Sequence, residues 1–407
     1  MFSPIQKHYA AGLSLDFASM VFQTVLPFYV FQRLGGGELM SGGIHAAMSL
    51  TYGVMCVIGA RLARDVRNGL PVAAAGALGY GLFIAICGAF ASPVPFTLAL
   101  MASTGCLAVV WPILYAWLAS EPDLARRGRI LSYFNIAWAL GLSAGSLAAG
   151  PLFERHYYLP VVAAIVTAAL AAALIFTQPS EKDYFGTQVG PLAGEAGPAG
   201  PAPPRYLAPS WIAMISGFAI QGASRSVYPK HFDDLVASNA VFVLPGGLFR
   251  LTGFESASLF SVLGFALTSA STLTFFIMGR TVRWHRGFSH IIAVQVLTAA
   301  ALYMLSATHS LAIMFVCFAL MGANAYVTLF TAVFHSVADP ERKRMNAAFT
   351  ESLVGLGAFA GSLSFALIAT YTSVASVFAY APAVILACVA AELVLVRRAR
   401  AAQPLGR

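Results

Sequence analysis

Long runs of apolar residues, separated by short polar connections, form the main pattern of the sequence. A helix that crosses a bilayer needs about 20 mostly apolar residues. The runs are unbroken, whereas a transmembrane β-barrel would show short segments that alternate between polar and apolar positions. We therefore predict twelve membrane-spanning helices, over residues 9–31, 40–62, 70–91, 95–119, 128–151, 157–177, 208–229, 254–279, 288–307, 310–335, 345–370 and 374–396.

A stretch of different composition separates the sixth predicted helix from the seventh. It contains the run GPLAGEAGPAGPAPP, in which Gly, Pro and Ala leave almost no side chain able to join a core. This composition is typical of a flexible linker. The sequence thus predicts an all-α, polytopic membrane protein with a six-helix bundle in residues 1–177, a linker in residues 178–207 and a second six-helix bundle in residues 208–407.

Composition narrows the class of protein. The 407 residues are 59% hydrophobic and only 10% charged, whereas a soluble domain carries about 25% charged residues. A cytosolic enzyme, a secreted disulfide scaffold and a disordered hub are excluded on this ground. The sequence contains no nucleotide-binding loop, catalytic motif or paired metal-ligand motif. We therefore expect a monomer in the lipid bilayer that is not an enzyme, holds no cofactor or metal, and draws its energy from an ion or solute gradient.

Basic residues indicate the orientation. The side that is predicted to carry both termini and the linker holds most of the 24 Lys and Arg residues. Under the positive-inside rule this side faces the cytoplasm. We expect both termini in the cytoplasm and the chain in the cytoplasmic (inner) membrane. The net charge of +8 is then an orientation signal and does not indicate nucleic-acid binding.

An internal repeat supports two related halves. The segment GLSAGSL that begins at Gly141 matches GAFAGSL that begins at Gly357, and Pro27 of the first span corresponds to Pro229 of the seventh. The loop after the second span reads GARLARDVRNG from Gly59 onward. Repeats of this kind are common in secondary transporters.

With these features the chain resembles the major facilitator superfamily over nearly its whole length. The loop that begins at Gly59 is similar to the family's Gly-x-x-x-Asp-Arg-x-Gly-Arg-Arg signature with a stretched spacing, and the resemblance implies a conformational latch at Asp65 and Arg67. The Gly141 segment is similar to the family's antiporter motif, with Ser146 in place of Pro, and the alternative explanation is close helix packing through small residues. The resemblance implies two pseudo-symmetric bundles that rock about a site near the midplane.

Three charged residues lie inside apolar spans, where a charge costs about 2.5 kcal/mol or more and normally faces the protein interior. They are Asp16 in the first span, Arg225 in the seventh and Glu351 in the eleventh. Asp16 is either a proton carrier or a structural partner within its half. Glu351 is either a second proton carrier, a site for a cationic solute, or a partner of the basic residues 342–344. Arg225 either recognises a carboxylate or phosphate or pairs with an acidic residue at the outer mouth, namely Asp233, Asp234 or Glu255.

Polar and aromatic side chains at helical spacing complete the candidate site. The predicted substrate-binding residues share a helical face with another polar or aromatic residue, and they are Gln23, Trp111, Tyr115, Gln221, Arg225, Asn324, Thr328 and His335. Aromatic rings that face a cavity hold apolar or ring-shaped solutes, although each of these residues also has an ordinary packing explanation. The apolar outer segment 230–254 is either an interfacial element or a lid.

We expect a secondary transporter that moves a small organic solute, preferably an anion, by proton-coupled alternating access, with Asp16 and Glu351 as the proton-coupling residues. Two alternatives remain open at this stage. One is a proton antiporter that exports drugs or lipids, which the aromatic residues favour. The other is a receptor or scaffold that has the fold and does not transport.

Overall fold

The computed structural model describes residues 3–65, 69–185, 206–246, 248–251, 255–281, 284, 287–336 and 343–401. Within these residues the chain is built almost entirely from long helices, and one short antiparallel hairpin is present. Eleven helical segments in this part of the chain are long and apolar enough to cross a membrane. Helix α9 (Leu207–Ser226) is long enough but less apolar; it corresponds to the seventh predicted span and brings the number of spans to twelve.

The first half of the chain follows the predicted spans to within a few residues. Its helices are α1 (Pro4–Gln23), α2 (Leu26–Arg33), α3 (Glu38–Asp65), α4 (Leu70–Ala89), α5 (Pro93–Ala119), α6 (Leu124–Arg155), α7 (Leu159–Phe176) and the short α8 (Glu181–Phe185). Helices α1, α4, α5 and α7 carry Pro in the first two positions, where its missing N–H costs no hydrogen bond. Most of the predicted linker lies outside the described residues, so its boundaries stay a prediction.

The second half contains α9, α10 (Tyr228–Ala237), α11 (Ser256–Arg280), α12 (Ser289–Ala307), α13 (Leu311–Ser336), α14 (Lys343–Tyr371) and α15 (Val374–Ala401). Strands β1 (Phe242–Leu244) and β2 (Leu248–Arg250) pair in antiparallel register, with Leu244 opposite Leu248. The outer segment 230–254 is therefore a short helix followed by a β-hairpin within its described residues.

The first and seventh predicted spans are each broken, which corrects the expectation of continuous helices. The break lies between Gln23 and Leu26 in the first half and at Val227 in the second. Pro27 and Pro229 each sit in the first turn of the helix that follows. Because Pro has no N–H and its ring crowds the preceding turn, it interrupts the helical ladder. The corresponding prolines thus produce the same bend in both halves.

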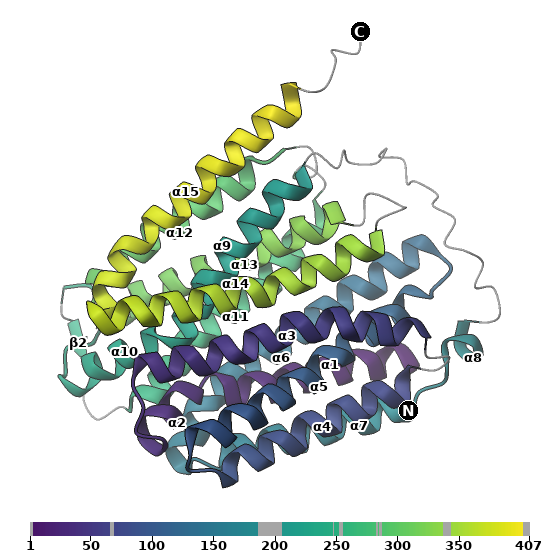
Figure 1. Ribbon diagram of the computed structural model, residues 1–407, viewed down its shortest axis with the longest axis horizontal. Coiled ribbons are helices and arrows are strands. Elements are labelled where there is room, and N and C mark those ends of the chain that lie inside the picture. The colour runs from purple at the N-terminus through teal and green to yellow at the C-terminus, as the bar shows by residue number, and fades with distance from the viewer. Residues whose placement is uncertain are drawn as a thin grey trace.

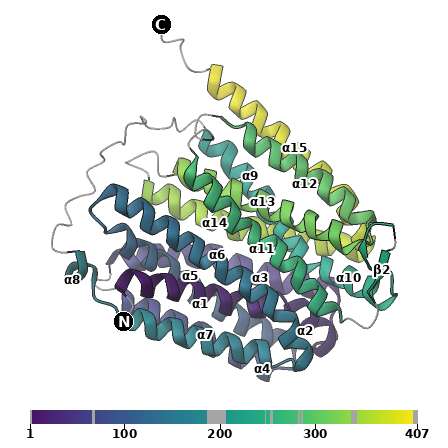
Figure 2. The ribbon, with the colours of Figure 1, turned by 180° about the vertical axis from the view of Figure 1, so that it is seen from behind.

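The helices run roughly parallel, so the bundle has two ends (Figure 1). Both termini and α8 lie at one end, which we call the terminal end; α2, α10 and the β-hairpin lie at the other, which we call the hairpin end (Figures 1 and 2). Termini on one side require an even number of spans, as the sequence predicts. Which end faces the cytoplasm stays a prediction.

The repeated glycine motif packs the same way in each half. A Cβ on Gly141 of α6 would lie 2.2 Å from the carbonyl oxygen of Leu13 in α1, and a Cβ on Gly357 of α14 would lie 2.8 Å from the carbonyl oxygen of Ile215 in α9. No side chain fits at either distance, so the glycines let the paired helices touch through their backbones. The motif therefore brings α6 against α1 and α14 against α9.

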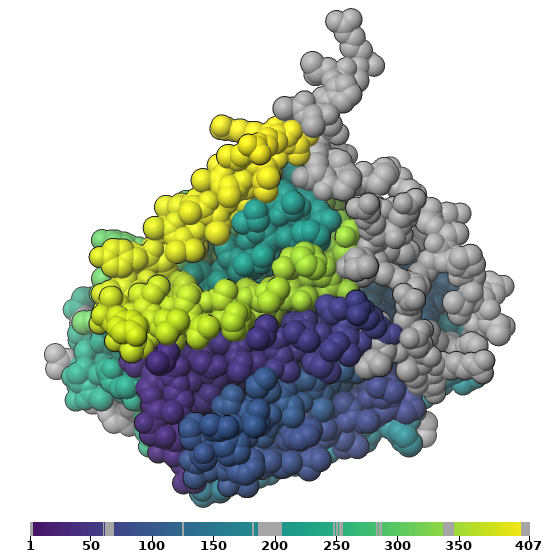
Figure 3. Space-filling model, in the orientation of Figure 1, coloured from purple at the N-terminus to yellow at the C-terminus, as the bar shows by residue number. Residues whose placement is uncertain are grey.

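Two long seams join the halves. Helix α3 lies along α14, as Figure 3 shows in purple and yellow-green, and α6 lies along α11. Midway along the first seam a Cβ on Gly355 would lie 2.6 Å from the backbone nitrogen of Gly53. Small residues at such a crossing allow two helices to approach closely.

Among the residues that the structure describes, hydrogen bonds between the two halves lie at the hairpin end. The Ser41 hydroxyl donates to the Ser226 carbonyl oxygen at 2.7 Å, and the Gly150 N–H donates to the Ser261 hydroxyl at 2.7 Å. The Glu154 carboxylate accepts from both the backbone N–H and the hydroxyl of Ser258. The structure is thus held closed at this end.

Candidate functional site

A charged residue of α1 and one of α9 approach each other from opposite halves. Asp16 is buried with 7% exposure in the middle of α1. It lies within electrostatic range of Arg225 near the end of α9, which also makes a polar contact with the Tyr326 hydroxyl of α13. No acidic residue in the described chain forms an ion pair with Arg225. Asp233 and Asp234, two of the partners considered above, instead accept from Ser256 and Lys230.

Several buried polar atoms around Arg225 have no hydrogen-bond partner among the described residues. They are Nη2 of Arg225 itself, Nε2 of Gln221 one turn earlier on α9, and Nε2 of His45 on α3. The His45 Nδ1 lies 2.9 Å from the Ser41 carbonyl oxygen, and the ring lies within electrostatic range of Arg225. Buried polar groups are normally hydrogen-bonded to protein or water. The unused donors of Arg225 and Gln221 are therefore suited to an acceptor that comes from a ligand or water.

Glu351 occupies a second position between the halves. It lies on α14, keeps part of its surface exposed, and is within electrostatic range of Tyr52 and Cys56 on α3 and of Tyr115 on α5. These three titratable neighbours all come from the opposite half. The basic residues 342–344, considered above as partners, lie outside the described residues or have side chains that the structure does not describe.

A hydrogen-bonded aromatic group lies on the first-half side of the interface. The Tyr115 hydroxyl donates to Asn135 Oδ1 at 2.8 Å, and the Trp138 indole N–H lies 3.1 Å from both the Tyr115 hydroxyl oxygen and Asn135 Oδ1. The Trp138 ring packs against Phe275 and Tyr326 of the second half, with centroids 5.1 and 6.2 Å apart. These rings connect the surroundings of Glu351 with those of Arg225.

The other predicted binding residues lie apart from this group or in local contacts. The Gln23 amide donates to the Ser19 hydroxyl at 2.8 Å, and Trp111 packs against Phe134. The predicted binding residues of α13, namely Asn324, Thr328 and His335, are fully buried. Thr328 faces Gly217 of α9, and its hydroxyl donates to the Asn324 carbonyl oxygen. Tyr326, which the sequence prediction did not include, is the α13 residue that contacts Arg225.

The predicted latch falls where the structure is not described: Arg67 lies outside the described residues, and only the backbone of Asp65, at the end of α3, is placed. The latch stays a prediction.

Sequence reasoning missed four polar or aromatic residues, namely His45, Trp138, Tyr326 and Glu392. Glu392 on α15 is completely buried and carried the same signal as Glu351, an acidic residue in an apolar run. Trp138 and Tyr326 carried no comparable signal, because both are uncharged aromatic residues, whereas His45 is an ionisable residue within a predicted span.

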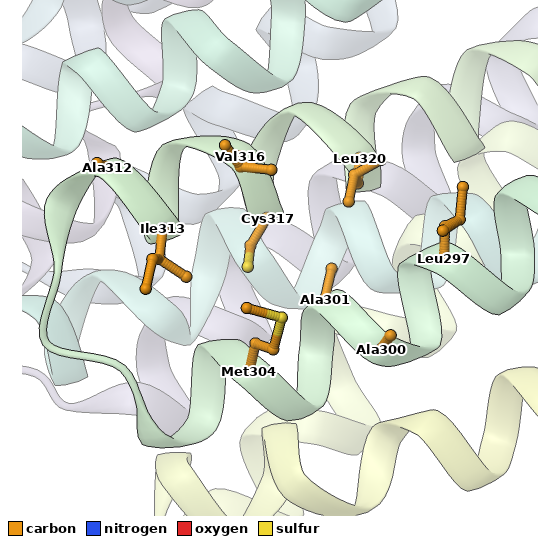
Figure 4. A pocket seen from close by; sticks show the side chains of 9 residues that line it. All are labelled: Leu297, Ala300, Ala301, Met304, Ala312, Ile313, Val316, Cys317 and Leu320. Atoms are coloured by element: carbon orange, nitrogen blue, oxygen red, sulfur yellow. The ribbon is translucent and has the colours of Figure 1, made fainter. Parts of the chain in front are cut away.

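The groove in Figure 4 lies between α12 and α13, has a volume of about 390 Å³, and is lined by Leu297, Ala300, Ala301, Met304, Ala312, Ile313, Val316, Cys317 and Leu320. None of these side chains is charged, so the groove has nothing to recognise an ionic solute. The described residues also contain no group of three or more His, Cys, Asp and Glu side chains placed to hold a metal ion.

Comparisons with known proteins agree with this architecture. The family model described as Major Facilitator Superfamily matches residues 9–362, and a search of curated proteins finds no match. Among solved structures, a POT family transporter in complex with a thioalcohol-conjugated peptide is 12% identical, with a TM-score of 0.74 over 97% of this chain and 96% of that one.

The nucleoside transporter NupG is 12% identical, with a TM-score of 0.71 over 97% of this chain and 99% of that one. A bacterial homolog of the human lysosomal transporter Spinster, solved in an inward-facing and occupied conformation, is 12% identical, with a TM-score of 0.66 over 97% of this chain and 95% of that one. At such identities the likeness establishes the fold alone. The family match covers most of the chain, and it follows that the chain belongs to the major facilitator superfamily.

Proposed function

We propose that the chain is a proton-coupled transporter of a small organic anion, with the terminal end facing the cytoplasm of a cell with an inner membrane. The observation that supports this best is the approach of Asp16 and Arg225 from opposite halves. An ionised Asp16 neutralises Arg225. Protonation of Asp16 removes that counter-charge, and a carboxylate or phosphate of the solute then takes its place, since the guanidinium suits either group.

The unpartnered donors around Arg225 are consistent with an anionic solute. Within the described part of the chain, Arg225 Nη2 and Gln221 Nε2 have no acceptor, and a carboxylate offers acceptor sites for both. The Trp138, Phe275 and Tyr326 rings supply an apolar wall for the rest of the molecule. Leaving buried donors unsatisfied costs about 1–3 kcal/mol each, so a solute that satisfies them binds preferentially.

Glu351 is proposed as the second proton-coupling residue. Its described neighbours Tyr52, Cys56 and Tyr115 belong to the other half, so a change in its charge acts directly on the interface that must open and close. Alternating access requires the halves to separate at one end while they close at the other. A carboxyl at the interface links this movement to proton binding.

Uptake into proteoliposomes tests the coupling. Asp16→Asn and Glu351→Gln should abolish accumulation driven by a pH gradient while solute exchange at equal concentrations persists, because exchange needs no net proton movement. Asp234→Asn, which changes a carboxylate on α10 outside the proposed site, is the control and should accumulate normally. The proposal fails if both variants, Asp16→Asn and Glu351→Gln, still accumulate solute.

A thermal-stability screen with anionic, neutral and cationic metabolites tests the solute class. A ligand at 100 times its Kd stabilises the folded protein by about 2.7 kcal/mol. We expect anions to raise the melting temperature, and Arg225→Ala to abolish the shift. The aromatic rings favour a second candidate, an exporter of amphipathic compounds; stabilisation by cations or amphipathic compounds through Asp16 or Glu351 would support it. A scaffold would show a single conformation with every compound.

A further inference from the structure

A buried acidic residue lies in the second half, away from the proposed solute site. Glu392 of α15 has 0% exposure, although it is an acidic residue within a membrane-spanning helix. Its Oε1 accepts a hydrogen bond from Gln295 Nε2 of α12 at 2.8 Å, and its Oε2 has no hydrogen-bond partner among the described residues. An ionisable residue at such a depth is costly and usually marks a function.

The amide of Gln295 is fixed by its second contact. Its Nε2 also donates to the Ser216 hydroxyl of α9 at 3.3 Å, and this hydroxyl in turn donates to the Ala213 carbonyl oxygen at 2.8 Å. Both amide hydrogens are therefore engaged, and the Gln295 Oε1 is left without a donor. Gln295 Oε1 and Glu392 Oε2 are thus both unused. Both can only accept a hydrogen bond, so they cannot bond to each other unless Glu392 is protonated.

Glu392 has no ion-pair partner within the part of the chain that the structure describes. Its hydrogen-bond partner Gln295 on α12 and the next group in this hydrogen-bonded series, Ser216 on α9, are neutral, and the Cys388 thiol one turn earlier on α15 lies within electrostatic range of it. An unpaired ionised carboxylate in such surroundings is far less stable than a neutral acid.

We propose that Glu392 is a further proton-binding residue, which holds its proton in a neutral acid–amide pair with Gln295. Binding adds one proton to Oε2, and the new O–H donates to Gln295 Oε1, which completes the second hydrogen bond of the pair. Loss of the proton leaves an unpaired negative charge between α9, α12 and α15. The residue therefore binds a proton between three helices of the second half.

This position is separate from the solute site. Ser216 and Arg225 are nine residues apart on α9, which is two and a half turns, so they lie on opposite faces of the helix. The inference concerns proton binding alone, and it stands whatever solute the central group takes.

Infrared spectroscopy of the purified full-length chain tests the proposal, because a protonated carboxyl has a carbonyl band that an ionised carboxylate lacks. At neutral pH, Glu392→Gln should remove one such band from the spectrum. Glu154→Gln is the matched control: this carboxylate accepts two hydrogen bonds as an ionised group, so its replacement should leave the protonated bands unchanged. Gln295→Leu should shift the Glu392 band to higher frequency without removing it.

Identical spectra of the wild-type protein and Glu392→Gln would overturn the proposal, since Glu392 would then be ionised. An unshifted band in Gln295→Leu would overturn the acid–amide pairing. If Glu392→Gln does not fold, Glu392→Asp replaces it, because this variant keeps the carboxyl group on a shorter side chain. A shift of the protonated-carboxyl band in Glu392→Asp would assign the band to residue 392. An unchanged spectrum would contradict that assignment. The infrared test does not depend on uptake measurements. If the proposed proton-coupled anion transport is disproved, the infrared result on Glu392 still stands.

Discussion

The Glu154 carboxylate of α6 caps the first turn of α11, because it accepts a hydrogen bond from the Ser258 backbone N–H at 2.6 Å and another from the Ser258 hydroxyl. A negative charge at the N-terminus of a helix is stabilised by the unpaired N–H groups there. The two residues belong to different halves of the chain. Their contact therefore stabilises the closed hairpin end.

Replacing Glu154 should loosen this end. Glu154→Gln removes the charge that faces the α11 N-terminus, and we expect the closed conformation to lose about 1–2 kcal/mol. Spin labels on cysteines introduced at Leu39 of α3 and Tyr371 of α14, both exposed at the hairpin end, should then show a larger population at long distance.

The control for this measurement is Asp234→Asn. Asp234 pairs with Lys230 inside α10, so it is a carboxylate at the same end that does not join the halves. An unchanged distance distribution in Glu154→Gln, or an equal change in the control, would show that the contact does not hold the end closed.

A side chain at position 355 should separate α3 from α14. A Cβ there would lie 2.5 Å from the Ser49 carbonyl oxygen and 2.6 Å from the Gly53 nitrogen. We expect Gly355→Leu to destabilise the packed state by about 1–3 kcal/mol, the usual cost of overpacking, and to lower both the melting temperature and transport. Gly43→Ala on α3 has no neighbour within 4 Å of its Cβ and should change neither. A Gly355→Leu protein that melts like the wild type would mean that the seam is not as tight as described.

Removing the Tyr326 hydroxyl should weaken solute binding with little effect on folding. Tyr326→Phe takes away the polar contact with Arg225 but keeps the ring against Phe275. We expect KM to rise by about five- to tenfold, which corresponds to about 1 kcal/mol, with a nearly unchanged maximal rate. Tyr303→Phe alters an exposed tyrosine on α12 and is the comparison. Equal KM values in the two variants would remove Tyr326 from the site.

The helices could be predicted well because each span depends on local composition. The twelfth expected span, 374–396, becomes α15 with the same first residue, and α15 continues to Ala401 through a basic segment that hydropathy alone excludes. The breaks at Gln23–Leu26 and Val227 were missed. Pro27 and Pro229 were visible in the sequence, but a proline in a membrane helix also fits a mild bend.

The site could be predicted only in part. Asp16, Arg225 and Glu351 were identified because a charge in an apolar run is rare. Which side chains surround them depends on how each helix is rotated and on how the halves meet, and a single sequence fixes neither. Thus Tyr326 was overlooked although it is two residues from Asn324, because those two residues point to different faces of α13.

Helix α9 has a consequence for how the protein is made. Unlike the other eleven spans, it is not apolar enough to be identified as a membrane span by its hydropathy. It also carries Arg225, whose insertion into the bilayer is unfavourable. Most of its residues are covered by α13, α14 and α15, all of which are synthesised after it. We therefore expect α9 to insert poorly into the bilayer when it leaves the translocon. It should reach its transmembrane position only after the last three helices have been synthesised. A chain truncated before α13 should accordingly have α9 outside the bilayer.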